Sequence, residues 1–410
     1  MGAGPAGLYF AILAKLRDPR DSVTVFERQA QGTSYGWGVT FVPALLRKLY
    51  ASDPESARSI EQAALRWRDQ FVDIHEMRMI YDGGVDVYNL NRPRLVEILT
   101  RRARQLGVPI EYGREISHPG QLPEADLIVA ADGAGSRLRQ SAGDFGTVVV
   151  QDDAKYIWLG TDRPFGAFAY HFRKTAAGWI WASSYGVESG LSTFVVHCAG
   201  RTWRGLGFDT MPPAETLAAL RGLYAGELAG HRLMGQLDDE TSARWQSFRT
   251  VTNEHWYQGK VVLVGDSGHT THFTVGEGTT LALEDASALA GSLRRHGAAE
   301  TALPAYERQR QAEIRHSQQQ ARRSARFFAS IPRYATLAPE EFGTLLHARR
   351  SPLLPLLPPR LYYQLHRASR QAPLLRQLRP VARALKHRLQ PPADISEAMN
   401  VSGDSGANAR

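Results

Sequence analysis

The first residues form a glycine-rich turn, Gly2-Ala3-Gly4-Pro5-Ala6-Gly7, which runs into a helical pattern that reaches about Arg17. Glycines at this spacing permit a tight turn, let the backbone approach a pyrophosphate and let the helix pack against its strand. The N-terminus of the helix then offers free N–H groups and a positive dipole to phosphate oxygens. This turn predicts a nucleotide-binding site at the start of the chain.

An acidic residue stands where such a turn requires one. The β-branched run 23–26 predicts a strand, which ends at Glu27 and Arg28. Glu27 lies twenty residues after Gly7, a position from which a carboxylate accepts hydrogen bonds from an adenosine ribose. The glycines and Glu27 together therefore indicate a dinucleotide.

The glycine turn departs from its usual context in one respect. It should follow a buried strand at the centre of a parallel sheet, yet only Met1 precedes Gly2. We expect either that several residues before Met1 are missing, or that the chain folds poorly around its cofactor. We favour the first explanation.

Two later motifs each follow an apolar run that is typical of a buried parallel strand. After residues 126–131, the strand delivers Asp132-Gly133 to a turn. After residues 260–264 comes Gly265-Asp266, where a carboxylate at a strand end can bind the ribitol hydroxyls of a flavin. A glycine-rich segment at 276–280 lets backbone N–H groups approach the isoalloxazine. The helix that begins there directs its positive end towards the negative charge of a reduced flavin, around N1 and O2.

The composition is ordinary for a globular protein, with 43% hydrophobic and 22% charged residues among 410. No apolar run reaches the roughly 20 residues that a membrane span needs, and no signal-peptide pattern is present. Cys198 is the single cysteine, which excludes an internal disulfide framework and a cysteine-rich metal cluster. We expect a cytoplasmic protein with no metal site and no membrane partner.

Together, the motifs GAGPAG, ADGAGSRLR and GDSGH…GEGTT…EDA resemble those of the group A (single-component) FAD-dependent aromatic monooxygenases, which share the p-hydroxybenzoate hydroxylase fold. The resemblance covers Gly2 to about Leu293. It implies that the glycine turn and Glu27 hold the ADP half of FAD, that Asp132 serves both FAD and NAD(P)H, and that Asp266 holds the ribitol. The cofactor-binding residues that it implies are Gly2, Gly4, Pro5, Ala6, Gly7, Glu27, Arg28, Arg92, Asp132, Asp266, Gly276, Gly278, Thr279 and Thr280.

Within that family, the chain is most similar to a subgroup comprising salicylyl-CoA 5-hydroxylase, 2-aminobenzoyl-CoA monooxygenase and the violacein-pathway monooxygenase. Gly36-Trp37-Gly38-Val39 and residues 155–161 carry this similarity, as do residues 192–196. Phe273 and Thr280 stand where the wider family has proline and asparagine. The subgroup implies a phenolic or amino-aromatic acid, bound as a CoA or carrier thioester, as substrate.

Candidate substrate contacts come from the predicted sheet and the loop near the flavin. They are Trp37, Tyr170, Tyr185, His272 and Phe273. Tyr170 and Tyr185 are equally well explained as core aromatics with hydrogen-bonded hydroxyls. His272 is better placed, because it adjoins the flavin loop.

The resemblance also implies the chemistry. NADH or NADPH reduces FAD, O2 adds to give a C4a-hydroperoxyflavin, and its distal oxygen attacks an electron-rich ring. Two alternatives stay open: an indole- or tryptophan-derived substrate in secondary metabolism, and an FAD-binding protein without oxygenase activity. We expect a monomer or homodimer and no nucleic-acid partner.

The order of expected elements predicts an α/β fold. A Rossmann-like FAD-binding domain is interleaved with a β-sheet substrate domain, and C-terminal helices follow. We assign residues 1–150 to the first part of the FAD-binding domain, with 40–90 on the substrate side. Residues 151–255 form the sheet domain and 256–295 the second FAD-binding part. A basic helical region at 296–390 and a disordered tail at 391–410 complete the prediction.

Part of the formal net charge of +8 is local, since residues 349–388 hold ten Lys and Arg and no Asp or Glu. This stretch is either a solvated helical face, a binding surface for a CoA thioester or an acidic carrier protein, or a contact with nucleic acid or membrane. Under the second interpretation, we expect Arg376, Arg379 and Arg383 to contribute to thioester binding.

Overall fold

The computed structural model describes residues 1–33, 36–236 and 242–371. The chain divides into two compact units, Met1–Pro355 and Leu356–Arg410. In the second unit the described residues contain helix α13 (Pro359–Gln371). The predicted tail at 391–410 and Arg376, Arg379 and Arg383 lie outside the described residues.

The N-terminal lobe is built around short parallel strands. β1 (Val25–Phe26) pairs with β5 (Ile110–Glu111), while β14 (Val261–Leu263) pairs with β6 (Ile128–Ala130) and, antiparallel, with β13 (Tyr257–Gln258). Met1 and Gly2 lie between these two small sheets. The Gly2 N–H donates to the Phe26 carbonyl at 2.8 Å, and the Ala131 N–H donates to the Met1 carbonyl at 2.8 Å. Met1-Gly2 thus occupies the central position that the sequence predicts for a strand before the glycine turn.

Five helices pack around these strands: α1 (Pro5–Arg17), α2 (Pro43–Ser52), α3 (Pro54–Ala63), α4 (Arg92–Gln105) and α9 (Gly278–His296). The short α5 (Arg137–Ser141) follows β6. Helix α1 contacts both α4 and α9 and is apolar on nearly every side, with Leu8, Tyr9 and Ile12 fully buried. Because a helix buried all round must be apolar all round, this packing explains why α1 carries no polar residue from Pro5 to Ala14 apart from the Tyr9 hydroxyl.

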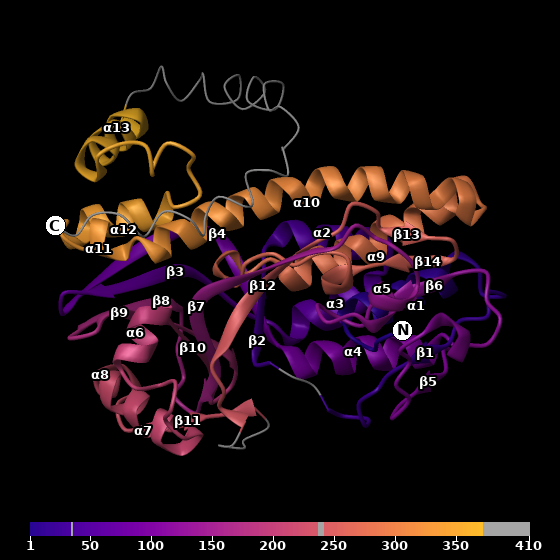
Figure 1. The fold of residues 1–410 in the computed structure, drawn as a ribbon, viewed down its shortest axis with the longest axis horizontal. Coiled ribbons are helices and arrows are strands. Elements are labelled where there is room, and N and C mark those ends of the chain that lie inside the picture. Colours follow the sequence, from indigo (N-terminus) through magenta and orange to yellow (C-terminus); the bar gives the residue numbers. More distant parts are fainter. Residues whose placement is uncertain (34–35, 237–241, 372–410) are drawn as a thin grey trace. The chain divides into compact units, whose positions relative to one another are not determined.

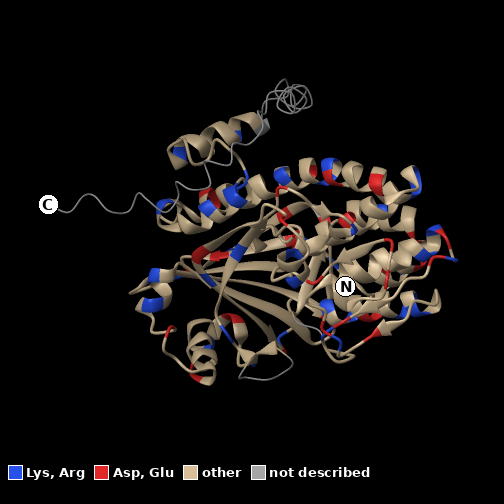
Figure 2. Cartoon of the chain, turned by 45° about the vertical axis from the view of Figure 1, so that its right-hand side comes forward, with Lys and Arg blue, Asp and Glu red and all other residues tan. Residues whose placement is uncertain are grey.

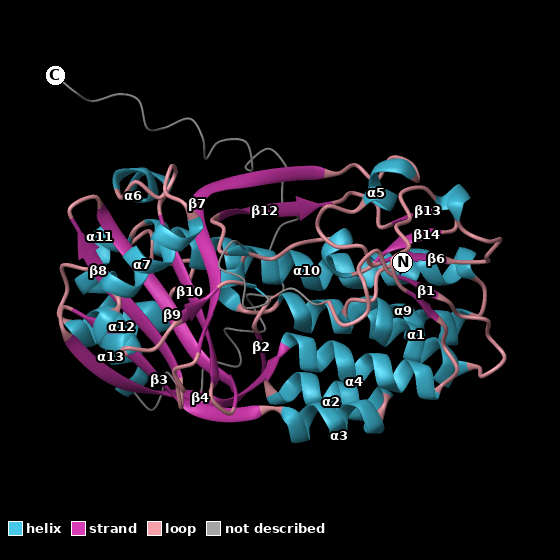
Figure 3. Cartoon of the chain, turned by 90° about the horizontal axis from the view of Figure 1, so that it is seen from below, coloured by secondary structure: helices cyan, strands magenta, loops and turns pink. Residues whose placement is uncertain are grey.

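A large sheet forms the second lobe, with strands in the order β11-β7-β10-β9-β8-β3-β4-β2 and β12 also paired with β7. The strands are β2 (Gly38–Phe41), β3 (Leu65–Ile74), β4 (Met77–Asn91), β7 (Val148–Thr161), β8 (Phe168–Thr175), β9 (Gly178–Glu188), β10 (Leu191–Cys198), β11 (Leu233–Met234) and β12 (Gln246–Thr252). Helices α6 (Gly200–Gly205), α7 (Pro213–Leu223) and α8 (Ala225–Leu228) lie by β8–β10 (Figures 1 and 3). They cover one face of this sheet, burying Ile157, Phe194 and Val196 against it.

Helix α10 (Ala299–Ala329) runs past both lobes (Figure 1). At one end the Tyr306 hydroxyl donates to the Leu263 carbonyl at 2.9 Å. At the other end Phe328 stacks on Trp181 of β9, with ring centroids 4.0 Å apart. Figure 2 shows basic and acidic residues interspersed along this helix. The chain then continues through α11 (Ile331–Tyr334) and α12 (Pro339–His347).

The structure confirms the predicted α/β fold class and the expected helices around the three motifs. The hairpin β3–β4 and strand β12 were not predicted. β3 reads LRWRDQFVDI, and its first half exposes charged side chains, so no apolar alternation marks the strand. None of the helices in the described ranges is long and apolar enough to cross a membrane.

Candidate active site

A cleft of about 1050 Å³ opens at the glycine turn, bordered by β1, α4 and the turn after β6. It brings together six of the predicted cofactor-binding residues: Gly2, Gly4, Glu27, Arg28, Arg92 and Asp132. Pro5, Ala6 and Gly7 lie behind its wall in the buried first turn of α1. Residues far apart in the sequence therefore converge on one cleft, as a dinucleotide site requires.

The three glycines of the turn, Gly2, Gly4 and Gly7, have different structural roles. A Cβ atom on Gly2 would lie 2.3 Å from the Ala131 carbonyl oxygen, and one on Gly7 would lie 2.1 Å from the Gly2 oxygen. Both glycines are therefore needed for close backbone packing. Around Gly4 nothing lies within 4 Å of the Cβ position, and no side chain caps the helix there. An open, uncapped helix N-terminus fits the pyrophosphate of FAD.

The Glu27 carboxylate is held at the cleft by two backbone donors. Ala3 N–H donates to its Oε2 at 2.7 Å, and Gln29 N–H donates to its Oε1 at 2.9 Å. Each oxygen retains a lone pair for another donor. This arrangement fits a ribose hydroxyl at the position that the sequence predicts.

Asp132 is engaged by its own turn. Its Oδ1 accepts from the Ser136 hydroxyl at 2.6 Å, and its Oδ2 accepts from the N–H groups of Arg137 and Leu138 at 2.9 and 3.2 Å. The carboxylate thereby supports the start of α5. In the same motif Arg139 donates to the Ser267 carbonyl at 2.6 Å, which ties this turn to the Gly265-Asp266 turn.

A buried ionic network fixes the turn that carries Asp266. The fully buried Asp285 of α9 accepts from the Gly265 N–H at 2.8 Å, from His269 Nε2 at 2.7 Å and from Arg310 Nε at 2.7 Å. Burial by itself raises the pKa of Asp285, but the charges of His269 and Arg310 and these hydrogen bonds hold it below its usual value. The network sets the backbone of Gly265 and hence the place of Asp266.

Arg92 links the cleft to Asp266. The Asp266 carboxylate is accessible to solvent, yet protein atoms crowd around it, and this desolvation raises its pKa against the opposing charges of His269 and Arg92. Desolvation also lowers the pKa of Arg92, while the charge of Asp266 raises it. Arg92 lines the cleft and Asp266 lies close enough to influence its charge, so a cofactor that extends from the ADP site can meet both.

The segment 272–277 before α9, which we call the flavin loop, is held by two arginines from after α12. Arg349 donates to the Thr274 carbonyl at 3.3 Å, and Arg350 donates to the Val275 carbonyl at 3.2 Å. Gly276 has a φ of +68°, and a Cβ there would lie 2.9 Å from Thr40 Oγ1. Gly278, Thr279 and Thr280 form the first turn of α9, which Glu277 does not cap with its side chain. The loop therefore leaves backbone N–H groups available at this helix end, as the flavin prediction requires.

Aromatic side chains converge on the sheet face opposite α6–α8. The pairing of β8, β9, β10 and β7 aligns the row Phe172, Trp181, His197 and Tyr156. Phe273 of the flavin loop stacks on His197 at 4.5 Å, and Phe328 of α10 stacks on Trp181 at 4.0 Å. In the neighbouring row, Tyr170 lies 6.0 Å from the Trp181 ring. We call Tyr170, Trp181, His197, Phe273 and Phe328 the aromatic cluster; it joins the sheet to the flavin loop.

Comparison with known proteins places this geometry in a family. A family model described as an FAD binding domain matches residues 118–321. Salicyloyl-CoA 5-hydroxylase of Streptomyces sp. is 35% identical, over 84% of this chain and 68% of the relative. The 3-hydroxy-4-methyl-anthranilyl-[aryl-carrier protein] 5-monooxygenase of Streptosporangium sibiricum is 34% identical, over 81% of this chain and 88% of the relative. The chain belongs to the FAD-dependent aromatic monooxygenases.

Solved structures agree at the level of fold. The 2-methyl-3-hydroxypyridine-5-carboxylic acid oxygenase matches with a TM-score of 0.65 at 19% identity, over 86% of this chain and 92% of that one. The predicted membership in this family and the predicted FAD cofactor are therefore confirmed. The roles of individual residues in the monooxygenase stay predictions.

Of the predicted substrate contacts, Tyr170 and Phe273 lie in the aromatic cluster. His272 is adjacent, but its Nδ1 faces the Thr274 hydroxyl at 3.1 Å and its Nε2 faces Asp152 at 3.5 Å. Both ring nitrogens of the buried His272 are thus directed at protein groups. The proximity of His272 keeps the pKa of Asp152 below its usual value, although burial opposes this.

The other two predicted contacts have packing roles in the monooxygenase. The Tyr185 hydroxyl donates to the Gly38 carbonyl at 3.1 Å, and the ring stacks between Trp67 and Phe168. The Trp37 ring lies so close to Gly160 of β7 that a Cβ there would come within 2.4 Å of it. The motif around Trp37 and the strand around Gly160 therefore form one interlocked contact.

Sequence reasoning missed Trp181, His197, Phe328 and Arg349. Arg349 forms no salt bridge in the described part of the chain; besides Thr274 it donates to the Tyr170 hydroxyl at 3.2 Å. Alternation along β8–β10 could have indicated that Trp181 and His197 share a face with Tyr170. No sequence signal pointed to Phe328 or Arg349.

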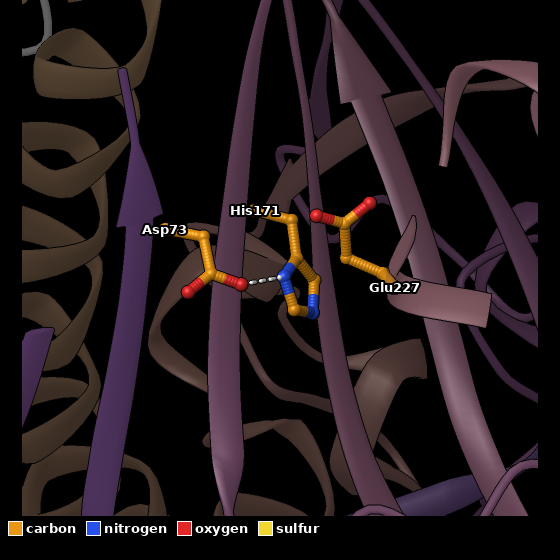
Figure 4. A group of neighbouring side chains, drawn as sticks. All are labelled: Asp73, His171 and Glu227. Atoms are coloured by element: carbon orange, nitrogen blue, oxygen red, sulfur yellow. Dashed lines mark hydrogen bonds and ion pairs between the residues drawn. The ribbon is translucent and has the colours of Figure 1, made fainter. Parts of the chain in front are cut away.

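A second polar cluster lies on the opposite face of the sheet. His171 Nδ1 pairs with Asp73 at 2.7 Å, and Glu227 of α8 lies on its other side (Figure 4). Asp73 also binds Arg78, and Glu227 binds Arg173. Burial keeps the pKa of His171 low, so two carboxylates face two guanidinium groups and the charges balance. The cluster is thus a compensated ionic network that joins α8 to the sheet.

Proposed function

We propose that this monooxygenase hydroxylates an electron-rich aromatic ring that is carried as a thioester on CoA or on a carrier protein. The aromatic cluster beside the flavin loop carries the proposal, because it offers flat, water-poor packing surfaces at the reacting end of the cofactor site. The relatives support the thioester: one is a hydroxylase of salicyloyl-CoA and another of an anthranilyl-[aryl-carrier protein].

FAD fits the site, and the residues that would hold it divide along its length. Gly2 and Gly4 would face the pyrophosphate and Glu27 the ribose, while Asp266 would hold the ribitol near Arg92. When bound, FAD supplies oxygen activation with electrons from NADH or NADPH. The uncapped end of α9 would face the ring system and favour its negative charge on reduction.

The chain's own residues have to orient the ring and exclude water. Tyr170, Trp181 and His197 are at most 6% exposed, so a ring that lies among them is shielded from solvent. Shielding matters because water would divert the reaction to hydrogen peroxide. Arg349 can only donate hydrogen bonds, so the oxygen of Tyr170 accepts and its own proton is directed elsewhere, available to a ligand.

An indole-derived substrate is the second candidate. The protodeoxyviolaceinate monooxygenase of Chromobacterium violaceum is 28% identical over 87% of this chain and 95% of the relative, which supports it. Indole rings and phenolic rings make the same stacking contacts, so the aromatic cluster suits both.

The decisive experiment compares substrates on the purified, FAD-loaded protein. Salicyloyl-CoA, 2-aminobenzoyl-CoA, the two free acids and indole are each tested for accelerated NAD(P)H oxidation and for hydroxylated product. We expect coupled product from a thioester and little from the free acids. Product from indole alone would favour the second candidate. Bound FAD with no acceleration by any compound would favour an FAD-binding protein without oxygenase activity.

A further inference from the structure

His197 is a buried imidazole whose hydrogen-bonding capacity the fold leaves unused. It is 4% exposed, and its Nδ1 is buried without a hydrogen-bond partner. Among the described residues, its Nε2 forms no hydrogen bond either. A buried polar atom left without a partner costs about 1–3 kcal/mol. A fold that retains such a group at a site often does so because a ligand supplies the partner.

The ring of His197 can interact with a ligand only through its edge. Trp181 stacks on it at 4.0 Å with an interplanar angle of 23°, and Phe273 at 4.5 Å with an angle of 13°. Two rings that both lie parallel to the imidazole at this distance must occupy opposite faces. The sandwich therefore fixes the plane of His197 and leaves the edge that carries its nitrogens as the contact surface.

The direction of His197 follows from strand alternation. Val196 and Cys198, its neighbours on β10, point into the hydrophobic core under α6–α8. His197 points to the other face, towards the flavin loop that supplies Phe273. Its place is thus at the reacting end of the cofactor site, whereas His171, on the opposite face, has partners for both ring nitrogens.

The protonation state of His197 defines what it can bind. Burial, with a smaller effect from nearby His272, lowers its pKa well below 6.5. The ring is therefore neutral at physiological pH, with one nitrogen as donor and one as acceptor. A neutral acceptor nitrogen suits the hydroxyl or amino group of an electron-rich aromatic ring.

We propose that the edge of His197 recognises the ring hydroxyl or amino group of the substrate and thereby selects electron-rich rings over unsubstituted ones. This inference rests on the proposed function and adds to it the residue that discriminates. A hydroxyl-bearing ligand gives the imidazole its missing hydrogen bond, and an analogue without the hydroxyl leaves the nitrogen unpaired. The preference is expected to be about tenfold or more in Kd.

Binding measurements on the FAD-loaded protein test this without turnover. Salicyloyl-CoA and benzoyl-CoA differ only in the ring hydroxyl, and their Kd values follow from the change in the flavin absorption spectrum. We expect the wild type to bind salicyloyl-CoA about tenfold more tightly, and His197→Phe, which keeps a ring in the sandwich, to bind both alike. FAD content and the thermal unfolding temperature establish that each variant is folded.

Two further variants sharpen the result. Val196→Ala removes buried methyl groups from the same strand on the opposite face, so it should retain the preference for salicyloyl-CoA. An asparagine amide can replace the Nδ1 of histidine and a glutamine amide its Nε2. Whichever of His197→Asn and His197→Gln keeps the preference therefore identifies the nitrogen that binds the hydroxyl.

The outcomes separate this inference from the proposed function. A preference that persists in His197→Phe, or a wild type that binds both thioesters equally, overturns the role of His197 alone. Loss of the preference in His197→Phe without hydroxylated product from any thioester upholds the role and overturns the proposed reaction. A wild type that binds neither thioester overturns both.

Discussion

Replacing Arg310 by methionine should expose how strongly the ionic network around Asp285 holds the flavin site. Arg310 is 1% exposed and Asp285 is fully buried, and their Nε and Oδ1 atoms lie 2.7 Å apart. Methionine keeps most of the aliphatic volume but removes the charge. The variant therefore leaves the buried Asp285 carboxylate without its arginine partner, while the more exposed Glu284 and Glu313, which also pair with Arg310, can turn to solvent.

Two estimates of the free energy of unfolding lost in Arg310→Met agree. Breaking a buried ion pair by removing one partner costs about 3–5 kcal/mol. Alternatively, Asp285 in the variant takes up a proton. Keeping a carboxyl group neutral at pH 7, about three units above its usual pKa, costs about 4 kcal/mol. We therefore expect the free energy of unfolding at pH 7 to fall by about 4 kcal/mol.

The stability deficit of Arg310→Met should also depend on pH. In the wild type the pKa of Asp285 is lowered, so the carboxylate stays charged over the neutral range. In Arg310→Met its folded-state pKa is raised, and a raised pKa gives stability that is present at low pH and lost as pH rises. The deficit relative to wild type should therefore shrink by about 1.4 kcal/mol per pH unit as pH falls from 7 to 5.

Urea unfolding followed by tryptophan fluorescence at pH 7, 6 and 5 measures this deficit. Arg68→Met removes an exposed partner of Asp82 and serves as the matched control; it should leave stability unchanged at every pH. Asp285→Asn combined with Arg310→Met should recover most of the loss, because no charge is then buried alone. A deficit that is small, or that does not change with pH, would refute the reasoning.

Three further predictions concern other parts of the monooxygenase. Gly4→Val should fold normally, because the φ of −74° at Gly4 suits any residue and a Cβ there meets nothing within 4 Å. The added side chain should instead block the approach of the pyrophosphate, so FAD titration should show a Kd raised roughly tenfold or more. Tyr170→Phe should lower kcat/KM, and Arg349→Met should lower it at least as much, because Arg349 both orients the Tyr170 hydroxyl and holds the Thr274 carbonyl. The double variant should fall no further than Arg349→Met, and additive losses would contradict this. Burial raises the pKa of Asp73, but His171 and Arg78 outweigh this effect and hold it at about 2. Asp73→Asn should therefore lower the free energy of unfolding by about 2 kcal/mol at pH 7 and leave it unchanged near pH 2, as measured by urea unfolding.

The cofactor half of the site could be predicted from sequence because its signals are local. Glu27 and the turns at Asp132 and Asp266 each follow a strand that shows as an apolar run, whereas only Met1 precedes the glycine turn. Parallel strands bring such turns to one edge of a sheet, so the convergence of Gly2, Glu27 and Asp132 on one cleft agrees with the topology. The position of Met1 and Gly2 between two small sheets agrees with the same topology.

The proposed substrate side of the site could not be predicted in this way, because it depends on long-range contacts. Alternation along β10 places His197 and Val196 on opposite faces, but it does not say which face meets the cofactor. That is decided by α6–α8, which cover one face, and by the flavin loop and α10, which reach the other. Trp37 and Tyr185 stay predicted contacts, and no sequence signal indicated that they also pack against Gly160 and bond to Gly38.

The basic residues after α12 contact the proposed substrate side of the site, although they lie far along the chain from the FAD motifs. Arg349 and Arg350, at the start of the basic stretch, contact the carbonyls of the flavin loop, so they do not form a merely solvated face. Phe328 completes the aromatic cluster and Arg349 donates to its Tyr170, both from positions beyond the three FAD motifs. A sequence can therefore retain every FAD-binding residue while residues 324–350 change the shape and charge of the substrate side. Relatives that share the FAD motifs can for this reason differ in substrate, and the side chains around Arg349 are where that difference should lie.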